Sequence, residues 1–105
     1  MDKYEYIPDE VKRIVKEIVP DARIIFYGSR ARGDARKDSD WDFLVIVKEE
    51  EFSFELKLKI WEAISPLEYE TGDEISVHTR SDEHVWKFQL LPYYQNVNKE
   101  GIELI

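Results

Sequence analysis

The sequence predicts a single α/β (α+β) domain in which a short sheet of at least three strands is covered by helices. Three runs rich in β-branched and aromatic residues have the length of buried strands: 23–27, 41–48 and 74–79. Longer segments between them repeat apolar residues at helical spacing. The 105 residues fit one domain, 1–105, and a hydrophobic content of 43% suffices for one core.

The first expected helix begins at Pro8 and ends before Pro20. Proline suits the first position of a helix, because the N–H group that it lacks has no partner there. The apolar residues of this segment recur at helical spacing: Val11, Ile14, Val15 and Ile18. We expect this helix to pack against the sheet and to carry no chemistry.

A glycine–serine turn follows the first strand. Gly28 ends the strand and allows a tight turn and a close approach of the backbone to a ligand. Ser29 offers a hydroxyl at the start of a short helix or turn that ends at Gly33, where free backbone N–H groups attract anions. Because Arg30 and Arg32 add positive charge nearby, we expect the turn and both arginines to bind phosphate groups.

Two aspartates stand at the start of the second strand. Asp40 and Asp42 are two residues apart, so they share one face of the strand, while Trp41 points to the other. Two carboxylates on one face repel each other unless a cation lies between them. Magnesium suits the pair, because it takes few carboxylates and completes its coordination with water and phosphate oxygens.

The acidic spacing also matches part of a calcium-binding EF-hand loop. Asp38, Asp40, Asp42 and Glu49 fall at the ligand positions of such a loop. Its sixth position requires glycine for a sharp turn, and Phe43 stands there. The residues after Asp42 also form a strand-like run, so the spacing does not favour an EF-hand.

The segment 54–60 fits either a strand or a helix. It alternates like a strand, but Phe54, Leu58 and Trp61 also fit helical spacing, and we expect a helix. The remaining expected features, in chain order, are the end of that helix at Ser65-Pro66, a turn over 71–73, a helix starting at 81–83 and a last helix over 93–100 that ends at Gly101.

Together the two motifs resemble the nucleotidyltransferase superfamily of DNA polymerase β-like folds, and more closely its minimal nucleotidyltransferases. The shared pattern is Gly28-Ser29, a spacer, and Asp40-Trp41-Asp42 leading into an apolar strand. The segments 30–34, 38–39, 92–96 and 99–102 are similar to the family as well. The resemblance implies a mixed sheet with helices mainly on one face, a triphosphate at the Gly-Ser turn, and one or two Mg²⁺ ions held by the two aspartates.

Members of that family carry a third carboxylate on a later strand, where it completes the site and can act as the base. Alternation places Glu74, Ser76 and His78 on one face of the expected third strand. Ser76 occupies the position of the third acid, which departs from the family pattern. Glu74 is therefore the candidate substitute as a catalytic carboxylate, and we expect no catalytic role for His78.

The resemblance implies a Mg²⁺-dependent enzyme that transfers a nucleoside monophosphate, AMP from ATP, to a hydroxyl acceptor. In the antitoxin members that this sequence resembles, the acceptor is a tyrosine or other hydroxyl on a partner protein, such as a helical HEPN-type toxin. We expect this class of acceptor, because the short chain has little room for a dedicated small-substrate domain. One alternative is a small-molecule acceptor such as an aminoglycoside. Another is a binding-only subunit that neutralises its partner without chemistry, which the atypical third acid favours.

Composition restricts partners and location. The net charge of −8 argues against a long polynucleotide as partner, and the absence of cysteine excludes disulfides and zinc–thiolate sites. Because no apolar stretch could span a bilayer and the N-terminus lacks a signal-peptide core, we expect a cytoplasmic protein. We expect the three tryptophans to be core or interface anchors: Trp41, Trp61 and Trp86. The sequence leaves the acceptor, the nucleotide preference and the oligomeric state open.

Overall fold

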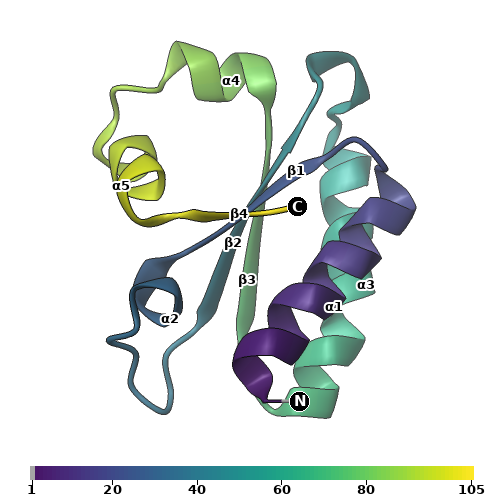
Figure 1. Cartoon of the computed structure of the whole chain (residues 1–105). Coiled ribbons are helices and arrows are strands. Elements are labelled where there is room, and N and C mark those ends of the chain that lie inside the picture. The colour runs from purple at the N-terminus through teal and green to yellow at the C-terminus, as the bar shows by residue number, and fades with distance from the viewer. Residues whose placement is uncertain (1) are drawn as a thin grey trace.

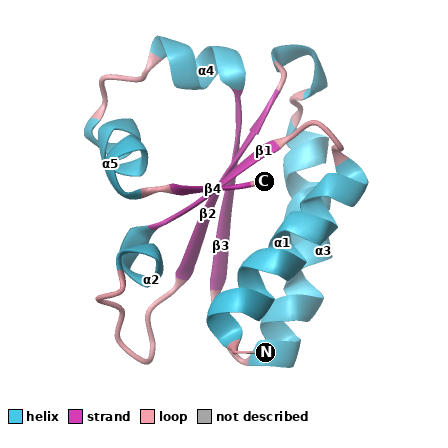
Figure 2. Cartoon of the chain, in the orientation of Figure 1, coloured by secondary structure: helices cyan, strands magenta, loops and turns pink. Residues whose placement is uncertain are grey.

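The computed structural model describes residues 2–105 and shows a four-stranded mixed sheet with helices on both faces (Figure 1, Figure 2). The strands are β1 (Arg23–Tyr27), β2 (Trp41–Val47), β3 (Ile75–Ser81) and β4 (Ile102–Leu104), in the order β3-β2-β1-β4. β1 runs antiparallel to β2 and β4, whereas β2 and β3 are parallel. The mixed sheet that the resemblance implies is therefore confirmed, with β4 as an additional strand.

The two long helices cover one face of this sheet. The helices are α1 (Lys3–Ile18), α2 (Gly28–Arg32), α3 (Phe54–Thr71), α4 (Asp82–Lys87) and α5 (Pro92–Glu100), with a 3₁₀ helix η1 (Glu49–Glu51) after β2. α1 and α3 lie side by side on one face, and α4 and α5 lie on the other (Figure 1). The prediction that helices cover mainly one face of the sheet holds for the two long helices, while the shorter α4 and α5 lie on the other face.

Strand alternation divides the buried residues into two groups. The larger group faces α1 and α3 and consists of Ile7, Val11, Val15, Val19, Ala22, Ile24, Phe26, Trp41, Phe43, Val45, Val47, Ile60, Ile64, Leu67 and Ile75. The smaller group faces α4 and α5 and consists of Ile25, Tyr27, Leu44, Ile46, Tyr94 and Val97. Because side chains alternate along a strand, β2 contributes to both groups.

Helix α1 begins at Lys3, so the prediction of a start at Pro8 was wrong. The side chain of Asp2 caps the helix by accepting a hydrogen bond from the Glu5 N–H at 3.1 Å. The ring of Tyr4 packs against Trp41, with 4.8 Å between the centroids, and Ile7 is fully buried. This packing stabilises the extra turn, although Pro8 cannot donate a helical hydrogen bond.

Helix α3 continues through Pro66, so its predicted end at Ser65-Pro66 was also wrong. Leu67 is buried against the core beyond the proline, and this apolar contact favours continuation of the helix. The helix ends where Gly72 adopts a left-handed conformation, φ 76°, and donates its N–H to the Glu68 carbonyl at 2.8 Å.

The three tryptophans have different environments. Trp41 is fully buried, as predicted for a core anchor, whereas Trp61 and Trp86 are 59% and 73% exposed and lie outside the core. The predicted start of α4 at 81–83 is confirmed, with Ser81 as its cap, and so is the predicted end of α5 at Gly101. α5 begins at Pro92, one residue before its predicted start. Within residues 2–105, no helix combines the length and apolar character needed to cross a bilayer.

Candidate active site

The end of β1 and the start of β2 meet at one corner of the sheet. The β1–β2 register places Tyr27 opposite Asp42, so Gly28 lies directly against the Asp42 carboxylate. Gly28 has φ 83°, and a Cβ added there would overlap an Asp42 side-chain oxygen. The close approach therefore requires glycine both sterically and conformationally. The structure brings together the glycine turn and the acidic pair, as the sequence predicts.

The turn after β1 forms the short helix α2. Gly33 closes it in a left-handed conformation and donates its N–H to the Ser29 carbonyl at 3.0 Å, while Asp34 donates to the same carbonyl at 3.1 Å. Ser29 is partly buried at the first turn of this helix. The predicted short helix is confirmed, and the binding of phosphate by Gly28 and Ser29 remains a prediction.

Burial and neighbouring negative charges both perturb the Asp42 carboxyl group. Burial, together with the negative charges of Asp40 and Glu100, raises the pKa of Asp42 to about 6, and Arg32 opposes this increase. Within residues 2–105, no group of three His, Asp or Glu side chains is arranged to hold a metal ion. Two carboxylates nevertheless fit Mg²⁺, since phosphate oxygens and water can supply its other ligands and the cation would offset their repulsion.

Glu100 is a site neighbour that sequence analysis missed. It lies at the end of α5 and forms an ion pair with Arg32, with 2.9 Å between Nη1 and Oε2. Arg32 also pairs with Asp34 at 3.2 Å. Only the packing of α5 beside α2 brings Glu100 to this corner, and no local sequence pattern signals it. Arg32, one of the two arginines predicted to bind phosphate, is therefore close to Asp40 and Asp42.

Arg30 lies on the opposite side of α2 and holds the loop before β2. Its guanidinium donates to the carbonyls of Lys37 and Ser39, each at 3.0 Å, and to the Tyr4 hydroxyl at 3.2 Å. The same group lies 4.7 Å from the centre of the Trp41 ring. These contacts fix the backbone that leads into Asp40, and the predicted contact of Arg30 with phosphate remains a prediction.

β3 places serine and glutamate at different parts of the site. The β2–β3 register puts Ser76 opposite Asp42, at the position expected for the third acid. Glu74 precedes β3, and its carbonyl accepts a hydrogen bond from the Trp41 N–H at 2.9 Å. A hydrogen bond with Asp40, and the charge of that residue, raise the pKa of Glu74. Glu74 thus lies beside Asp40 and not directly opposite Asp42.

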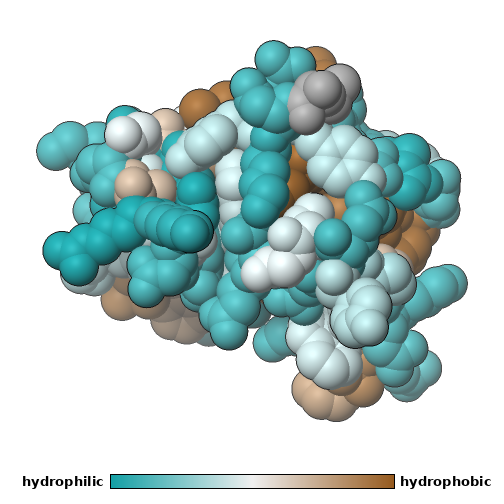
Figure 3. Space-filling model, turned by 90° about the horizontal axis from the view of Figure 1, so that it is seen from below, coloured by the Kyte–Doolittle hydropathy of each residue, from teal (hydrophilic) through white to brown (hydrophobic). Residues whose placement is uncertain are grey.

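The side chains of Tyr27 and Tyr93 lie close to Asp42. The hydroxyls of Tyr27 and Tyr93 are 2.8 Å apart, and burial raises the pKa of both side chains. The His78 ring lies 6.3 Å from that of Tyr93, and burial together with the charge of Arg80 lowers the pKa of His78, which favours its neutral form. Seen from the end at which β2 and β3 begin, the surface is mostly hydrophilic (Figure 3).

Comparison with known proteins agrees with this geometry. The family model for the nucleotidyltransferase domain matches residues 8–102. The chain belongs to the nucleotidyltransferase domain family. A probable protein adenylyltransferase, MntA of Haemophilus influenzae, is 42% identical over 55 residues, which are 52% of this chain and 47% of the relative. The chain therefore aligns with about half the length of that relative.

Solved structures share the nucleotidyltransferase fold. A crystal structure of a toxin–antitoxin with AMP-PNP has a TM-score of 0.64 and 16% identity, covering 93% of this chain and 72% of that one. The Cid1 poly(U) polymerase with MgGTP bound has a TM-score of 0.51 and 28% identity, covering 63% of this chain and 22% of that one. The first likeness shows the fold alone, which confirms the predicted fold class.

Proposed function

We propose that this domain is a Mg²⁺-dependent nucleotidyltransferase that transfers AMP from ATP to a hydroxyl group on a partner protein. The observation that supports this most strongly is the contact between Gly28 and Asp42, with Asp40 nearby. A single polyphosphate can touch both the turn and the carboxylates. The name of the Haemophilus influenzae relative, probable protein adenylyltransferase, supports AMP as the group transferred.

Each residue type at the site has a distinct task. Gly28 and Ser29 bind the phosphates of ATP, and Arg32 contributes positive charge beside them. Asp40 and Asp42 hold Mg²⁺, which supplies charge neutralisation for the leaving pyrophosphate when bound. The acceptor oxygen forms a bond to the α-phosphorus, and the bond from that phosphorus to the bridging oxygen breaks. Pyrophosphate then leaves, and the hydroxyl proton passes to the base.

Glu74 is our candidate for that base. Its carboxylate lies beside Asp40, and its raised pKa makes it a better proton acceptor than an ordinary glutamate. Ser76, although opposite Asp42, cannot act as a carboxylate. We expect Glu74→Gln to slow transfer far more than His78→Ala, and equal rates for Glu74→Gln and wild type would remove Glu74 from the mechanism.

A binding-only subunit is the second candidate function. The observation that favours it is the serine at position 76, because the described part of β3 places no carboxylate opposite Asp42. Such a subunit would bind nucleotide and partner without transfer. The toxin–antitoxin structure with AMP-PNP supports a protein partner in both cases, and we propose a HEPN-type helical protein for this role.

Label transfer separates the two functions. The protein is incubated with Mg²⁺, α-labelled ATP and candidate partner proteins, beside an Asp40→Asn/Asp42→Asn double variant. Loss of the metal ligands removes several kcal/mol of transition-state stabilisation, so labelling should fall about a thousandfold. Asp38→Asn, an exposed acid in the same loop, is the matched control and should label normally. Nucleotide binding without transfer to a validated partner would favour the binding-only subunit.

A further inference from the structure

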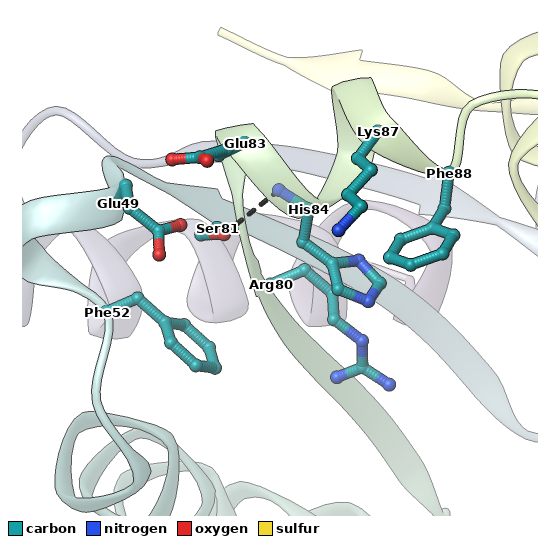
Figure 4. Close-up of a pocket in the computed structure, with 8 residues that line it drawn as sticks. All are labelled: Glu49, Phe52, Arg80, Ser81, Glu83, His84, Lys87 and Phe88. Carbon is teal, nitrogen blue, oxygen red and sulfur yellow. Dashed lines mark hydrogen bonds between the residues drawn. The ribbon is translucent and has the colours of Figure 1, made fainter.

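A cavity of about 360 Å³ lies on the same sheet face as Asp42, between β3 and the α4–α5 segment. Its lining residues are His78, Arg80, His84, Leu91, Tyr93 and Tyr94, and we call it the Arg80 cavity. A second cavity of about 290 Å³ shares Arg80 and His84 and continues toward η1, where Glu49 and Glu83 line it together with Lys87. Figure 4 shows the Arg80 and His84 side chains side by side in that continuation, with Phe52 facing them.

The Arg80 cavity is basic in a chain whose net charge is −8. None of its six lining residues is acidic. Arg80 donates to the Thr79 carbonyl at 2.9 Å and takes no part in the ion pairs formed among residues 2–105. A partly buried guanidinium with no carboxylate partner suits an anionic ligand, because its planar fork binds carboxylate or phosphate groups with two hydrogen bonds.

The register of β2 and β3 fixes the position of this cavity relative to the active site. Ser76 lies opposite Asp42, and Arg80 lies opposite Ile46, farther along the same face of β3. A strand rises about 3.3 Å per residue, so the backbone of Arg80 is about 13 Å from that of Ser76. A ligand group at Arg80 and a reacting group at Asp42 can therefore belong to one extended molecule.

The direction of the transfer reaction points to the same side of the sheet. α2 follows β1, so a triphosphate bound at α2 has its leaving pyrophosphate on the β1 side. In-line displacement requires the attacking hydroxyl on the far side of the α-phosphorus. Because β2 lies between β1 and β3, that far side is the β3 side, where the Arg80 cavity lies.

We propose that the Arg80 cavity is the acceptor site, and that it binds an acidic polypeptide segment whose carboxylate pairs with Arg80 while a nearby hydroxyl reaches Asp42. This inference rests on the proposed nucleotidyl transfer, and the bonds made and broken are those given above. A polycationic acceptor such as an aminoglycoside does not suit a cavity lined by arginine and lacking acids.

The surface beside the cavity suits a protein and not a free small molecule. Leu91 lines both the Arg80 cavity and a neighbouring cavity of about 410 Å³ formed by residues 87–91. Leu90 is 83% exposed, and Trp86 is exposed as well. Exposed apolar side chains next to a charged pocket are typical of protein-binding surfaces, where aromatic residues serve as anchors.

Transfer to a pair of peptides tests the charge preference. Both peptides contain one tyrosine and differ only four residues away, where one has glutamate and the other lysine. With α-labelled ATP and Mg²⁺, we expect wild type to label the glutamate peptide about tenfold faster, Arg80→Gln to lose this preference, and Arg80→Glu to reverse it. Arg13→Gln, on the opposite sheet face, is the matched control. Equal labelling by wild type, or an unchanged preference in Arg80→Glu, would overturn the proposal.

A binding measurement without nucleotide or Mg²⁺ separates this proposal from the transferase itself. Titration of ¹⁵N-labelled protein with the glutamate peptide should shift the NMR signals of the cavity residues in wild type and Arg13→Gln, but not in Arg80→Gln. Arg80-dependent binding with no labelling of either peptide, together with no transfer to a validated partner, would reject the transferase and support the peptide site. Identical shifts in Arg80→Gln, or tighter Arg80-dependent binding of inorganic phosphate than of peptide, would overturn the peptide assignment.

Discussion

The sheet face under α1 and α3 is closed and apolar, whereas the face under α4 and α5 has a smaller apolar group beside ionisable side chains. β2 contributes to both, with Phe43 and Val45 on the closed face and Asp42 and Leu44 on the other. Because side chains alternate along a strand, the carboxylates can be held near a cation without entering the main core. Folding stability and chemistry can therefore be changed separately in this domain.

Ile60→Ala should produce the largest change in stability. Ile60 is fully buried on the closed face, and its truncation removes apolar contacts and leaves a cavity. We expect the free energy of unfolding to fall by about 2–5 kcal/mol. Urea unfolding measures the loss, and Mg²⁺–ATP affinity of the protein that remains folded should not change. A weakened affinity without loss of stability would contradict the separation of the two faces.

Gly28→Ala tests the corner at which the turn meets the carboxylate. The added methyl group would displace the Asp42 carboxylate, and alanine at a φ of 83° costs about 1–2 kcal/mol. We therefore expect moderate destabilisation together with loss of Mg²⁺-dependent nucleotide binding, measured by calorimetry. Gly33→Ala has similar backbone strain but open space around its Cβ, so it should lose stability and retain binding.

The pH dependence of stability should reveal the raised pKa of Asp42, which burial and neighbouring negative charges cause. Folding raises the pKa of this carboxyl from 3.8 to about 6, so the folded state binds the proton more tightly. Its contribution to stability is present in full below pH 3.8 and is lost as pH rises through 6. Asp42→Asn should therefore gain stability relative to wild type between pH 4 and 7 in Mg²⁺-free denaturant titrations. A constant difference would show that the site does not perturb this carboxyl.

Tyr27→Phe, on the sheet face under α4 and α5, should change stability the least of these variants. It removes the 2.8 Å hydrogen bond to Tyr93 and leaves that partly buried hydroxyl without its partner. We expect a loss of about 1 kcal/mol in thermal or urea unfolding. Tyr69→Phe serves as the control, because Tyr69 is almost fully exposed and should unfold like wild type.

Local patterns in the sequence predicted the strands and the acidic face well. Strand 23–27 matches β1, and alternation correctly separated Asp42 from Trp41. The predictions failed where tertiary packing outweighs local preference. Pro8 and Pro66 were expected to bound helices but lie inside them, because the buried Ile7 and Leu67 stabilise the helical turns past each proline. Pro20, in contrast, follows the end of α1 as predicted.

The parts of the site that depend on distant contacts could not be predicted. Glu100 reaches Arg32 only because α5 packs beside α2, and Tyr27 meets Tyr93 because α5 also packs against β1. β4 is short and mostly exposed, so its pairing with β1 leaves little signal in its own residues. Trp61 and Trp86 lie outside the core, so the alternative that they anchor an interface stays a prediction, because hydrophobicity alone does not show whether a side chain packs in the core or against another molecule.

The contacts of Arg30 with the adjoining rings of Tyr4 and Trp41 have a consequence for remote control of the site. This cluster ties the first turn of α1 to the loop that leads into Asp40, although that turn lies outside the catalytic corner. Phosphorylation or nitration of Tyr4, or any ligand that pulls this turn from the sheet, would loosen the loop. Metal affinity would then fall while every coordinating oxygen stayed chemically intact.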